Sequence, residues 1–485
     1  MSRIPPTTNL WVRGWTRIGT RYLPFADAAT AEMPLGRLCR LGMFQLSVAM
    51  ASTLLAGTLN RVMIIELKVP ASLVALMVSL PLLIAPFRAL IGFRSDNYKS
   101  VLGWRRVPFI WFGSLMQFGG LAVMPFALIL LSGDTHGSVW AARAIAAFAF
   151  VLVGAGAHTT QTAGLALATD LSTEEARPRA VALLYVIQLC GMFLSALVFG
   201  QLLGDFSQLR LIKIIQGAAV VTMLINVIAL WKQEARVPYG TKREAADNEA
   251  PTGFREAWKI FTAGGRAVRL LVAVALGAAA FSMQDILLEP YGGQILHLGV
   301  GSTTLLTAMM AAGSLAACMM SARALRNGTD PARLSATGLV VGVFAFSAVI
   351  FSAPLDSALL FRIGTTAIGF GSGLFGVGTL LSAMSLRENA QNGLALGAWG
   401  AVQATSSGVA VGLGGVIRDL IAPIAARGGL GEALQAPFVS YSVVYHIEIA
   451  LLFATLIAIG PLVAPLGARR TDRRISSFGL ADLPG

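Results

Sequence analysis

Apolar segments long enough to cross a lipid bilayer recur along the whole chain, and they restrict its possible folds severely. About 20 apolar residues in a helix span the roughly 30 Å hydrocarbon core. Of the 485 residues, 55% are hydrophobic and 13% are charged, whereas soluble domains carry about 25% charged residues. Because a helix satisfies its own backbone hydrogen bonds in lipid, the sequence predicts an all-α polytopic membrane protein.

About twelve transmembrane helices are predicted. Their expected ranges are 41–60, 70–93, 107–131, 139–169, 179–203, 211–231, 267–289, 301–322, 334–354, 357–384, 393–417 and 439–465. The longest polar interval, Lys232 to Lys259, divides these spans six and six. The expected organisation is an N-terminal segment (1–40), a six-helix half (41–231), a linker (232–266), a second six-helix half (267–465) and a tail (466–485).

The basic residues are dispersed between the spans, which argues against nucleic-acid binding despite a formal net charge of +13. Cytoplasmic loops of membrane proteins carry an excess of Lys and Arg. Few basic residues occupy one set of alternate loops: Arg61, Lys68, Arg143, Arg210 and Lys213. The other loops and both terminal regions hold many more, including Arg37, Arg40, Arg94, Lys99, Arg105, Arg106, Lys232, Arg236, Arg469 and Arg470. Both termini are therefore expected to be cytoplasmic.

The N-terminal stretch "NLWVRGWTRIGTRYL" has an amphipathic pattern. Trp11 and Trp15 share one helical face, while Arg13, Arg17 and Arg21 share another. This pattern favours a helix that lies on the membrane surface, with its aromatic side in the headgroups. The alternative is a disordered basic tail, because two glycines weaken the helix.

The fourth span contains polar residues that need partners in lipid. At 100° per residue, Gly156, Thr160, Gly164 and Ala168 form one small-residue face, which is suited to close helix packing. The opposite face carries His158, Gln161 and Thr162. These residues either hydrogen-bond within the bundle or contact a ligand, and the imidazole is chemically able to be the axial ligand of a chlorophyll-type magnesium.

The seventh span ends in a polar stretch, with Gln284 followed by Asp285 and Glu289 at i and i+4. Paired carboxylates in a membrane helix could carry protons or bind a cation. The favoured prediction is that they sit at the watery end of the span, because Pro290 and a Gly pair would end the helix there. His446 and Glu448, at the start of the last span, are likewise expected at the membrane interface.

No sequence pattern typical of catalysis is present. The chain lacks HExxH, GxSxG and Walker sequences, and its four histidines lie in separate segments. Its three cysteines are isolated, so neither a disulfide framework nor a zinc site is indicated and no free metal is expected. The sequence predicts a protein that is not an enzyme.

The loop "GFRSDNYKSVLGWRR" after the second span resembles the signature loop of the major facilitator superfamily. The matching residues are Gly92, Asp96, Gly103, Arg105 and Arg106. An acid at a helix end and a following arginine pair can join neighbouring helix ends by charge-assisted hydrogen bonds. Extra residues separate the acid from the arginines, and the equivalent loop of the second half lacks the pattern, so the resemblance leaves a full alternating-access cycle in question.

Longer blocks resemble the PucC/LhaA family of photosynthetic bacteria, the bacteriochlorophyll delivery branch of that superfamily. They are Leu59–Asp96, Leu102–Leu128, "HTTQTAGLALATDL" (His158–Leu171) and "MQDILLEPYGGQIL" (Met283–Leu296). The resemblance implies a factor in a bacterial inner or intracytoplasmic photosynthetic membrane. Such a factor brings (bacterio)chlorophyll or a related tetrapyrrole to light-harvesting antenna polypeptides, or shepherds them during ring assembly. Reaction centre–antenna complexes and pigment-synthesis enzymes are further partners that it allows.

Three functional hypotheses follow. The first is the pigment-delivering assembly factor that the resemblance implies. The second is a secondary transporter of a small solute, which the two-half outline and the acids of the seventh span favour. The third is a membrane chaperone that packs antenna helices without handling pigment.

The charge distribution generates a test of orientation. In a cysteine-free background, a single cysteine near Gly293 should react with a membrane-impermeant reagent applied from the periplasm, and one within 240–250 should not. Labelling of the linker with sparing of the Gly293 position would reverse the orientation.

Overall fold

The computed structural model describes residues 33–84, 91, 95, 103–131, 138–173, 176–234, 265–385 and 392–463. Within these ranges the regular structure is entirely helical, and eleven helices are long and apolar enough to cross a membrane. The shorter apolar helix α3 (Ala71–Ile84) adds a twelfth element to the pattern. The predicted all-α polytopic fold with about twelve spans is confirmed.

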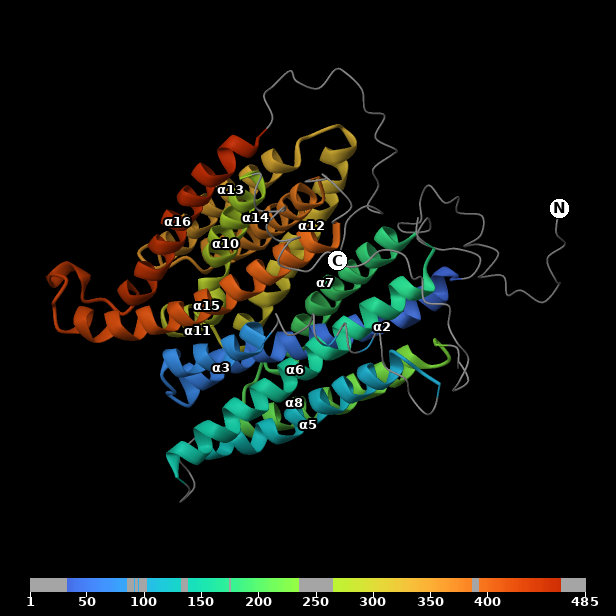
Figure 1. Cartoon of the computed structure of the whole chain (residues 1–485). Helices are drawn as coiled ribbons and strands as arrows, with labels where there is room; N and C mark the ends of the chain where they lie inside the picture. The colour runs from blue at the N-terminus through green and yellow to red at the C-terminus, as the bar shows by residue number, and fades with distance from the viewer. Residues whose placement is uncertain are drawn as a thin grey trace, which may run out of the picture.

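Two bundles follow one another in the chain, one drawn in blue to green and the other in yellow to red (Figure 1). The N-terminal bundle contains α2 (Leu35–Ser52) with its π-helical extensions (Thr53–Leu59 and Val62–Glu66), α3, α5 (Val107–Leu131), α6 (Val139–Leu171), α7 (Arg177–Leu202) and α8 (Gln208–Leu230). The C-terminal bundle contains α10 (Arg266–Ser282), a 3-10 turn (Met283–Ile286), α11 (Leu288–Gln294), α12 (Val300–Arg326), α13 (Pro331–Ser352), α14 (Ala358–Ser385), α15 (Asn392–Ala426) and α16 (Val439–Ile459). Short 3-10 turns lie at Glu432–Leu434 and Gly460–Leu462.

Some helices extend beyond the predicted spans. The first apolar helix runs from Leu35 to Glu66, so Arg37 and Arg40 lie on it rather than in a segment that precedes it. The sequence predicts a loop at Arg61, but this residue lies inside the same helix and is only 5% exposed. Helix α15 continues to Ala426, past the predicted end at residue 417. The proposed surface helix with Trp11, Trp15, Arg13, Arg17 and Arg21 lies outside the described residues.

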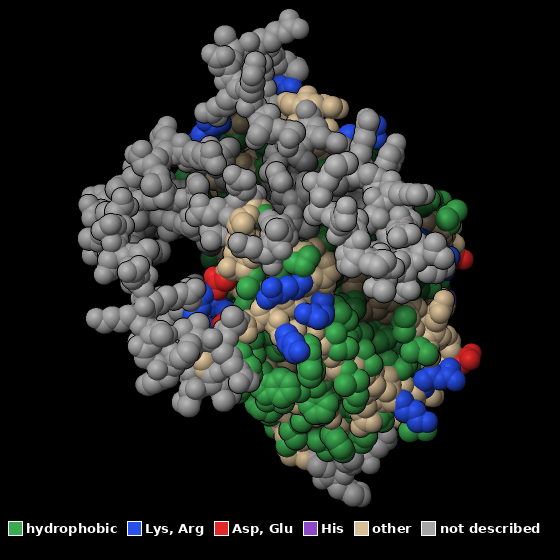
Figure 2. Space-filling view, turned by 90° about the vertical axis from the view of Figure 1, so that its right-hand side faces the viewer, with side chains coloured by type: hydrophobic (Ala, Val, Ile, Leu, Met, Phe, Trp, Pro, Cys, Tyr) green, Lys and Arg blue, Asp and Glu red, His purple; other side chains and the backbone are tan. Residues whose placement is uncertain are grey.

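Basic side chains mark one end of the N-terminal bundle, where α2 and α5 begin and α8 ends. We call this end, which carries Arg37, Arg105, Arg106 and Lys232, the arginine-rich end. Figure 2 looks at the molecule from this side and shows Lys and Arg side chains along the border of a broad hydrophobic surface. This arrangement is typical of a membrane edge, where apolar side chains face lipid and cations face headgroups.

The small-residue face of α6 packs as predicted. A Cβ atom on Gly156 would lie 2.6 Å from the Gly113 carbonyl oxygen of α5, and one on Gly164 would lie 2.6 Å from the ring of Phe44 on α2. Thr160 and Ala168 on the same face are fully buried. This close packing turns the opposite face of α6, which carries His158, Gln161 and Thr162, toward partly exposed surroundings.

The two halves join through the helix pairs α3–α15 and α7–α12. Small residues permit these contacts: Gly415 lies against Ala71 and Ala75, and Gly200 lies against Gly301. Hydrogen bonds between the halves also lie at the end opposite the arginine-rich end. They join Thr58 to Thr304 at 3.3 Å, the Asn60 amide to the Asp285 carbonyl at 3.2 Å, and the Ser72 N–H to the Asp419 carboxylate at 2.7 Å.

Candidate functional site

The arginine pair of the signature-like loop binds an acid at the end of a neighbouring helix. The Arg106 Nε donates to Asp170 at 3.0 Å, and Arg105 donates to the same carboxylate oxygen. Arg106 is almost fully buried and also donates to the Ser95 hydroxyl. Gly103 precedes the pair with a φ of 80°, a left-handed conformation that favours glycine. Gly92 and Asp96 lie outside the described residues, so the predicted role of that acid is untested.

A second acid closes the same cluster through the backbone. The Glu234 carboxylate, just beyond α8, accepts the N–H groups of Arg105 at 2.8 Å, Arg106 at 3.1 Å and Val107 at 2.9 Å. These donors stand at the start of α5 and have no acceptor within that helix. A negative charge at a helix N-terminus also interacts favourably with the helix dipole. Glu234 therefore fastens the end of α8 to the beginning of α5.

The polar face of α6 belongs to a cluster of three glutamines. The Gln161 amide nitrogen donates to the Gln188 side-chain oxygen of α7 at 3.0 Å and to that of Gln45 on α2 at 3.3 Å. The Thr162 hydroxyl donates to the His158 carbonyl at 2.7 Å. His158, Gln161, Thr162 and Gln188 are all half-buried. The first three lie on the α6 face opposite its small residues, and their role as ligand contacts stays a prediction.

The glutamine cluster lies beside the boundary between the two halves. Leu184 and Ile187 of α7 pack on Gly42 of α2, while Ala182 and Leu189 pack in a cluster with residues of the C-terminal half. At 100° per residue, Gln188 projects between these two faces of α7. The glutamine cluster therefore presents amide groups close to the inter-half surface.

Two polar residues of the seventh span, Gln284 and Glu289, are buried, so the prediction that they sit at its watery end is wrong for them, whereas Asp285 is half-buried. Glu289 is 3% exposed and Gln284 is fully buried. The Thr307 hydroxyl donates to Glu289 Oε1 at 2.9 Å, and the Gln284 amide donates to Asp285 at 2.6 Å. Glu289 Oε2 and Gln284 Oε1 are buried atoms without a hydrogen-bond partner among the described residues.

The error comes from Pro290. The chain breaks its α-helix at the 3-10 turn Met283–Ile286 and resumes as α11, from Leu288 to Gln294. Pro290 is the third residue of α11, where its missing N–H would have had no partner in the helix. Helix α11 therefore continues through Pro290 and includes Gly292 and Gly293. This places Glu289 inside the protein.

Two further ionic residues extend this buried region. Glu448 of α16, expected at the membrane interface, is fully buried and accepts the Gln284 backbone N–H at 2.7 Å. Its neighbour His446 is exposed. Arg61 of the first helix bonds to Glu66 at 2.7 Å and donates to the Leu298 carbonyl of the other half at 3.2 Å.

Sequence reasoning missed several of these partners. Asp170, Glu234, Gln45 and Gln188 were not predicted as site residues. Gln45 and Gln188 carried a usable signal, since a glutamine inside an apolar span needs a partner. Within the described residues, no three His, Cys, Asp or Glu side chains form a group that could hold a metal ion.

The chain has a two-half helical membrane fold of the major facilitator type. Its structure is similar to that of a bacterial homolog of the human lysosomal transporter Spinster, solved in an inward-facing and unoccupied conformation. The TM-score is 0.64 at 13% sequence identity, over 89% of this chain and 98% of that chain.

The family follows from the sequence comparisons. The model of the "PUCC protein" family matches residues 58–466, so the chain belongs to this family. It is 56% identical to "Protein PucC" of Rhodovulum sulfidophilum, over 83% of this chain and 89% of that protein. It is 55% identical to an "Uncharacterized protein in puhA-bchM intergenic region" of Rhodobacter capsulatus, over 96% of this chain and 97% of that protein.

The Glu234 cap can be tested by its contribution to stability. Glu234→Gln removes the charge that faces three N–H groups, so it should destabilise the protein by about 1 kcal/mol and lower the thermal unfolding midpoint in detergent. Glu432→Gln is the matched control, because Glu432 is exposed at the opposite end of the molecule. Equal midpoints for the two variants would contradict the role of Glu234 as a cap.

Proposed function

We propose that this protein is an assembly factor for photosynthetic light-harvesting antenna. It holds (bacterio)chlorophyll or a related tetrapyrrole between its halves and passes it to antenna polypeptides. Membership of the PUCC family and the sequence blocks that resemble pigment-delivery proteins support this function. The observation that carries the proposal is the half-exposed polar face of α6, which joins three helices beside the inter-half boundary.

The residues of this face fit a tetrapyrrole that contains magnesium. Such a pigment needs one axial donor, and His158 offers an imidazole on a half-buried face. The amide nitrogen of Gln161 donates hydrogen bonds to two neighbouring glutamines. Its carbonyl oxygen can therefore accept a hydrogen bond or serve as an alternative ligand. Thr162 lies on the same face beside His158 and completes the candidate pigment contacts.

Orientation and location are part of the proposal. The arginine-rich end faces the cytoplasm, in accordance with the positive-inside rule, and both termini lie on that side. The membrane is the bacterial cytoplasmic or intracytoplasmic photosynthetic membrane. The partners are antenna polypeptides, with reaction centre–antenna complexes and pigment-synthesis enzymes as further candidates. The protein is not an enzyme and pigment is its cargo.

Proton-coupled or cation-coupled transport of a small solute is a second candidate function. Glu289 and Glu448 are buried carboxylates that each carry an oxygen without a hydrogen-bond partner among the described residues. Buried acids inside a membrane bundle often mark proton or ion pathways. A chaperone without pigment is a third candidate, which the pigment measurement below separates from the first.

The test compares two substitutions of His158. His158→Leu removes the donor and keeps the bulk, whereas His158→Gln keeps a ligating oxygen. We expect pigment that co-purifies with the protein to fall several-fold in His158→Leu and to be retained more fully in His158→Gln. His446→Leu is the matched control, because His446 is an exposed histidine of another helix. If both His158 variants bind pigment and assemble antenna as the wild type does, His158 is a structural residue.

A further inference from the structure

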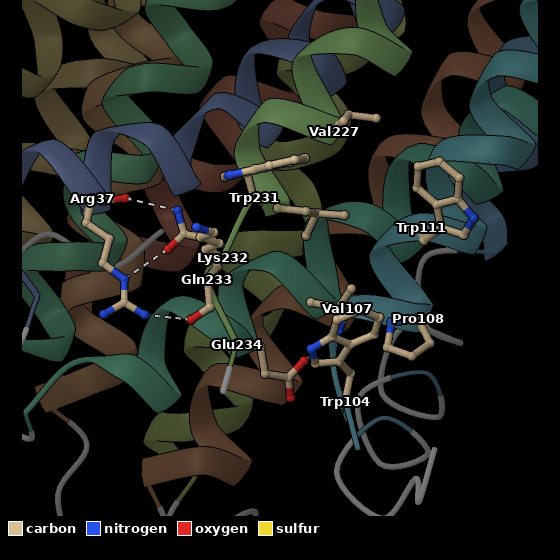
Figure 3. A pocket seen from close by; sticks show the side chains of 11 residues that line it. Arg37, Trp104, Val107, Pro108, Trp111, Val227, Trp231, Lys232, Gln233 and Glu234 are labelled. Atoms are coloured by element: carbon tan, nitrogen blue, oxygen red, sulfur yellow. Dashed lines mark hydrogen bonds between the residues drawn. The ribbon is translucent and has the colours of Figure 1, made fainter. Parts of the chain in front are cut away.

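An apolar groove lies at the arginine-rich end, on the outer side of the N-terminal half (Figure 3). It has a volume of about 780 Å³. Its walls are the first turns of α5, with Val107 and Trp111, and the end of α8, with Val227 and the following residue Trp231. Trp104 closes it on one side. Neither α5 nor α8 belongs to the helix pairs that join the halves, so the groove faces away from the inter-half surface (Figure 1).

The chain that follows α8 fixes the shape of this groove. Gln233 is buried and pairs with Arg37, which donates to its side-chain oxygen at 3.3 Å and to its carbonyl at 2.6 Å (Figure 3). Glu234 holds the start of α5, as described above. These two anchors tie α2, α5 and α8 together, so the groove exists before any ligand enters.

Lys232 is placed differently from these anchors. The φ of Lys232 is 52°, a left-handed backbone conformation that is uncommon for residues other than glycine. The next residue, Gln233, is buried. Lys232 is exposed, and it makes no hydrogen bond or ion pair with the other described residues. The second cation of the lining, Arg37, is engaged with Gln233. Among the described residues that line the groove, the only acid is Glu234, which already accepts three N–H groups. Lys232 is therefore the charge available to a ligand.

The position of the groove matches the boundary between lipid tails and headgroups. Trp111 is 42% exposed and Trp231 is 60% exposed, and indoles favour this depth of a bilayer. The hydrophobic surface bordered by Lys and Arg side chains in Figure 2 lies at the same end of the molecule. An occupant must combine an apolar chain with a negatively charged head.

We propose that this groove is a binding site for an anionic phospholipid. The head phosphate lies at Lys232, and an acyl chain runs along the apolar wall formed by Trp111, Val227 and Leu230. Basic pockets at the ends of transmembrane helices bind anionic headgroups in this way. The volume is that of a small-molecule site, roughly 300–1,000 Å³, and an α-helix about 10 Å across would not fit inside it.

Native mass spectrometry of the full-length detergent-purified protein tests this proposal. The probes are phosphatidylglycerol, zwitterionic phosphatidylcholine and glycerol phosphate. We expect preferential binding of phosphatidylglycerol, and a loss of about fivefold in its affinity in Lys232→Gln. Lys213→Gln, at the other end of the same helix, is the matched control and should bind phosphatidylglycerol as the wild type does.

A second variant tests the apolar wall. Trp111→Ser should weaken the binding of phosphatidylglycerol, while Trp140→Ser, an exposed tryptophan at the opposite membrane edge, should not. Unchanged phosphatidylglycerol binding in Lys232→Gln or in Trp111→Ser would overturn the proposal. Equal affinity for phosphatidylglycerol and phosphatidylcholine would also overturn it, as would binding of glycerol phosphate as tight as that of phosphatidylglycerol. A polypeptide that is lost from the Trp111→Ser protein while lipid binding persists would assign the groove to a protein partner.

Discussion

Polar groups within the hydrocarbon core need hydrogen-bond partners, and this requirement determines how the helices of this protein are arranged. Gln161 meets two glutamines from neighbouring helices, and Arg61 reaches a carbonyl of the opposite half. Glu289 accepts a hydrogen bond from Thr307. An unsatisfied polar group in such surroundings costs roughly several kcal/mol, so each of these contacts fixes the relative position of two helices. The polar residues of the spans are therefore both structural ties and the candidate binding groups.

The N-terminal half is held at its arginine-rich end by charges and elsewhere by small residues. Arg105 and Arg106 join Asp170, and Glu234 caps α5, so these contacts connect the ends of α5, α6 and α8. Deeper in the bundle, Gly156 allows the backbones of α5 and α6 to approach closely. A rigid half of this kind can present the polar face of α6 on its inner side and the lipid groove on its outer side without coupling the two.

Local sequence patterns predicted what depends on helical geometry. The packing face and the polar face of α6 follow from 100° per residue, and both are found as expected. The arginine pair of the loop does bond to the end of a neighbouring helix. Its partners were not predicted, because Asp170 and Glu234 lie 64 and 128 residues away from Arg106, and only the packing of α5 against α6 and α8 brings them together.

The prediction for Glu289 failed for a similar reason. A proline and two glycines usually end a helix, and the sequence alone could not reveal that the helix had already broken at Met283. Pro290 then falls in the first turn of a new helix and is tolerated there. The burial of Glu448 depends on the distant Gln284 in the same way. Pairwise contacts between helices, rather than periodicity within one helix, decide which polar residues are inside.

The most direct measurement for the pigment-handling account is the visible and near-infrared absorption spectrum of the wild-type protein, purified in mild detergent from pigment-replete photosynthetic cells. The account predicts a bacteriochlorin band that stays with the protein through size-exclusion chromatography. A protein that is folded and monodisperse under these conditions but carries no such band would contradict it.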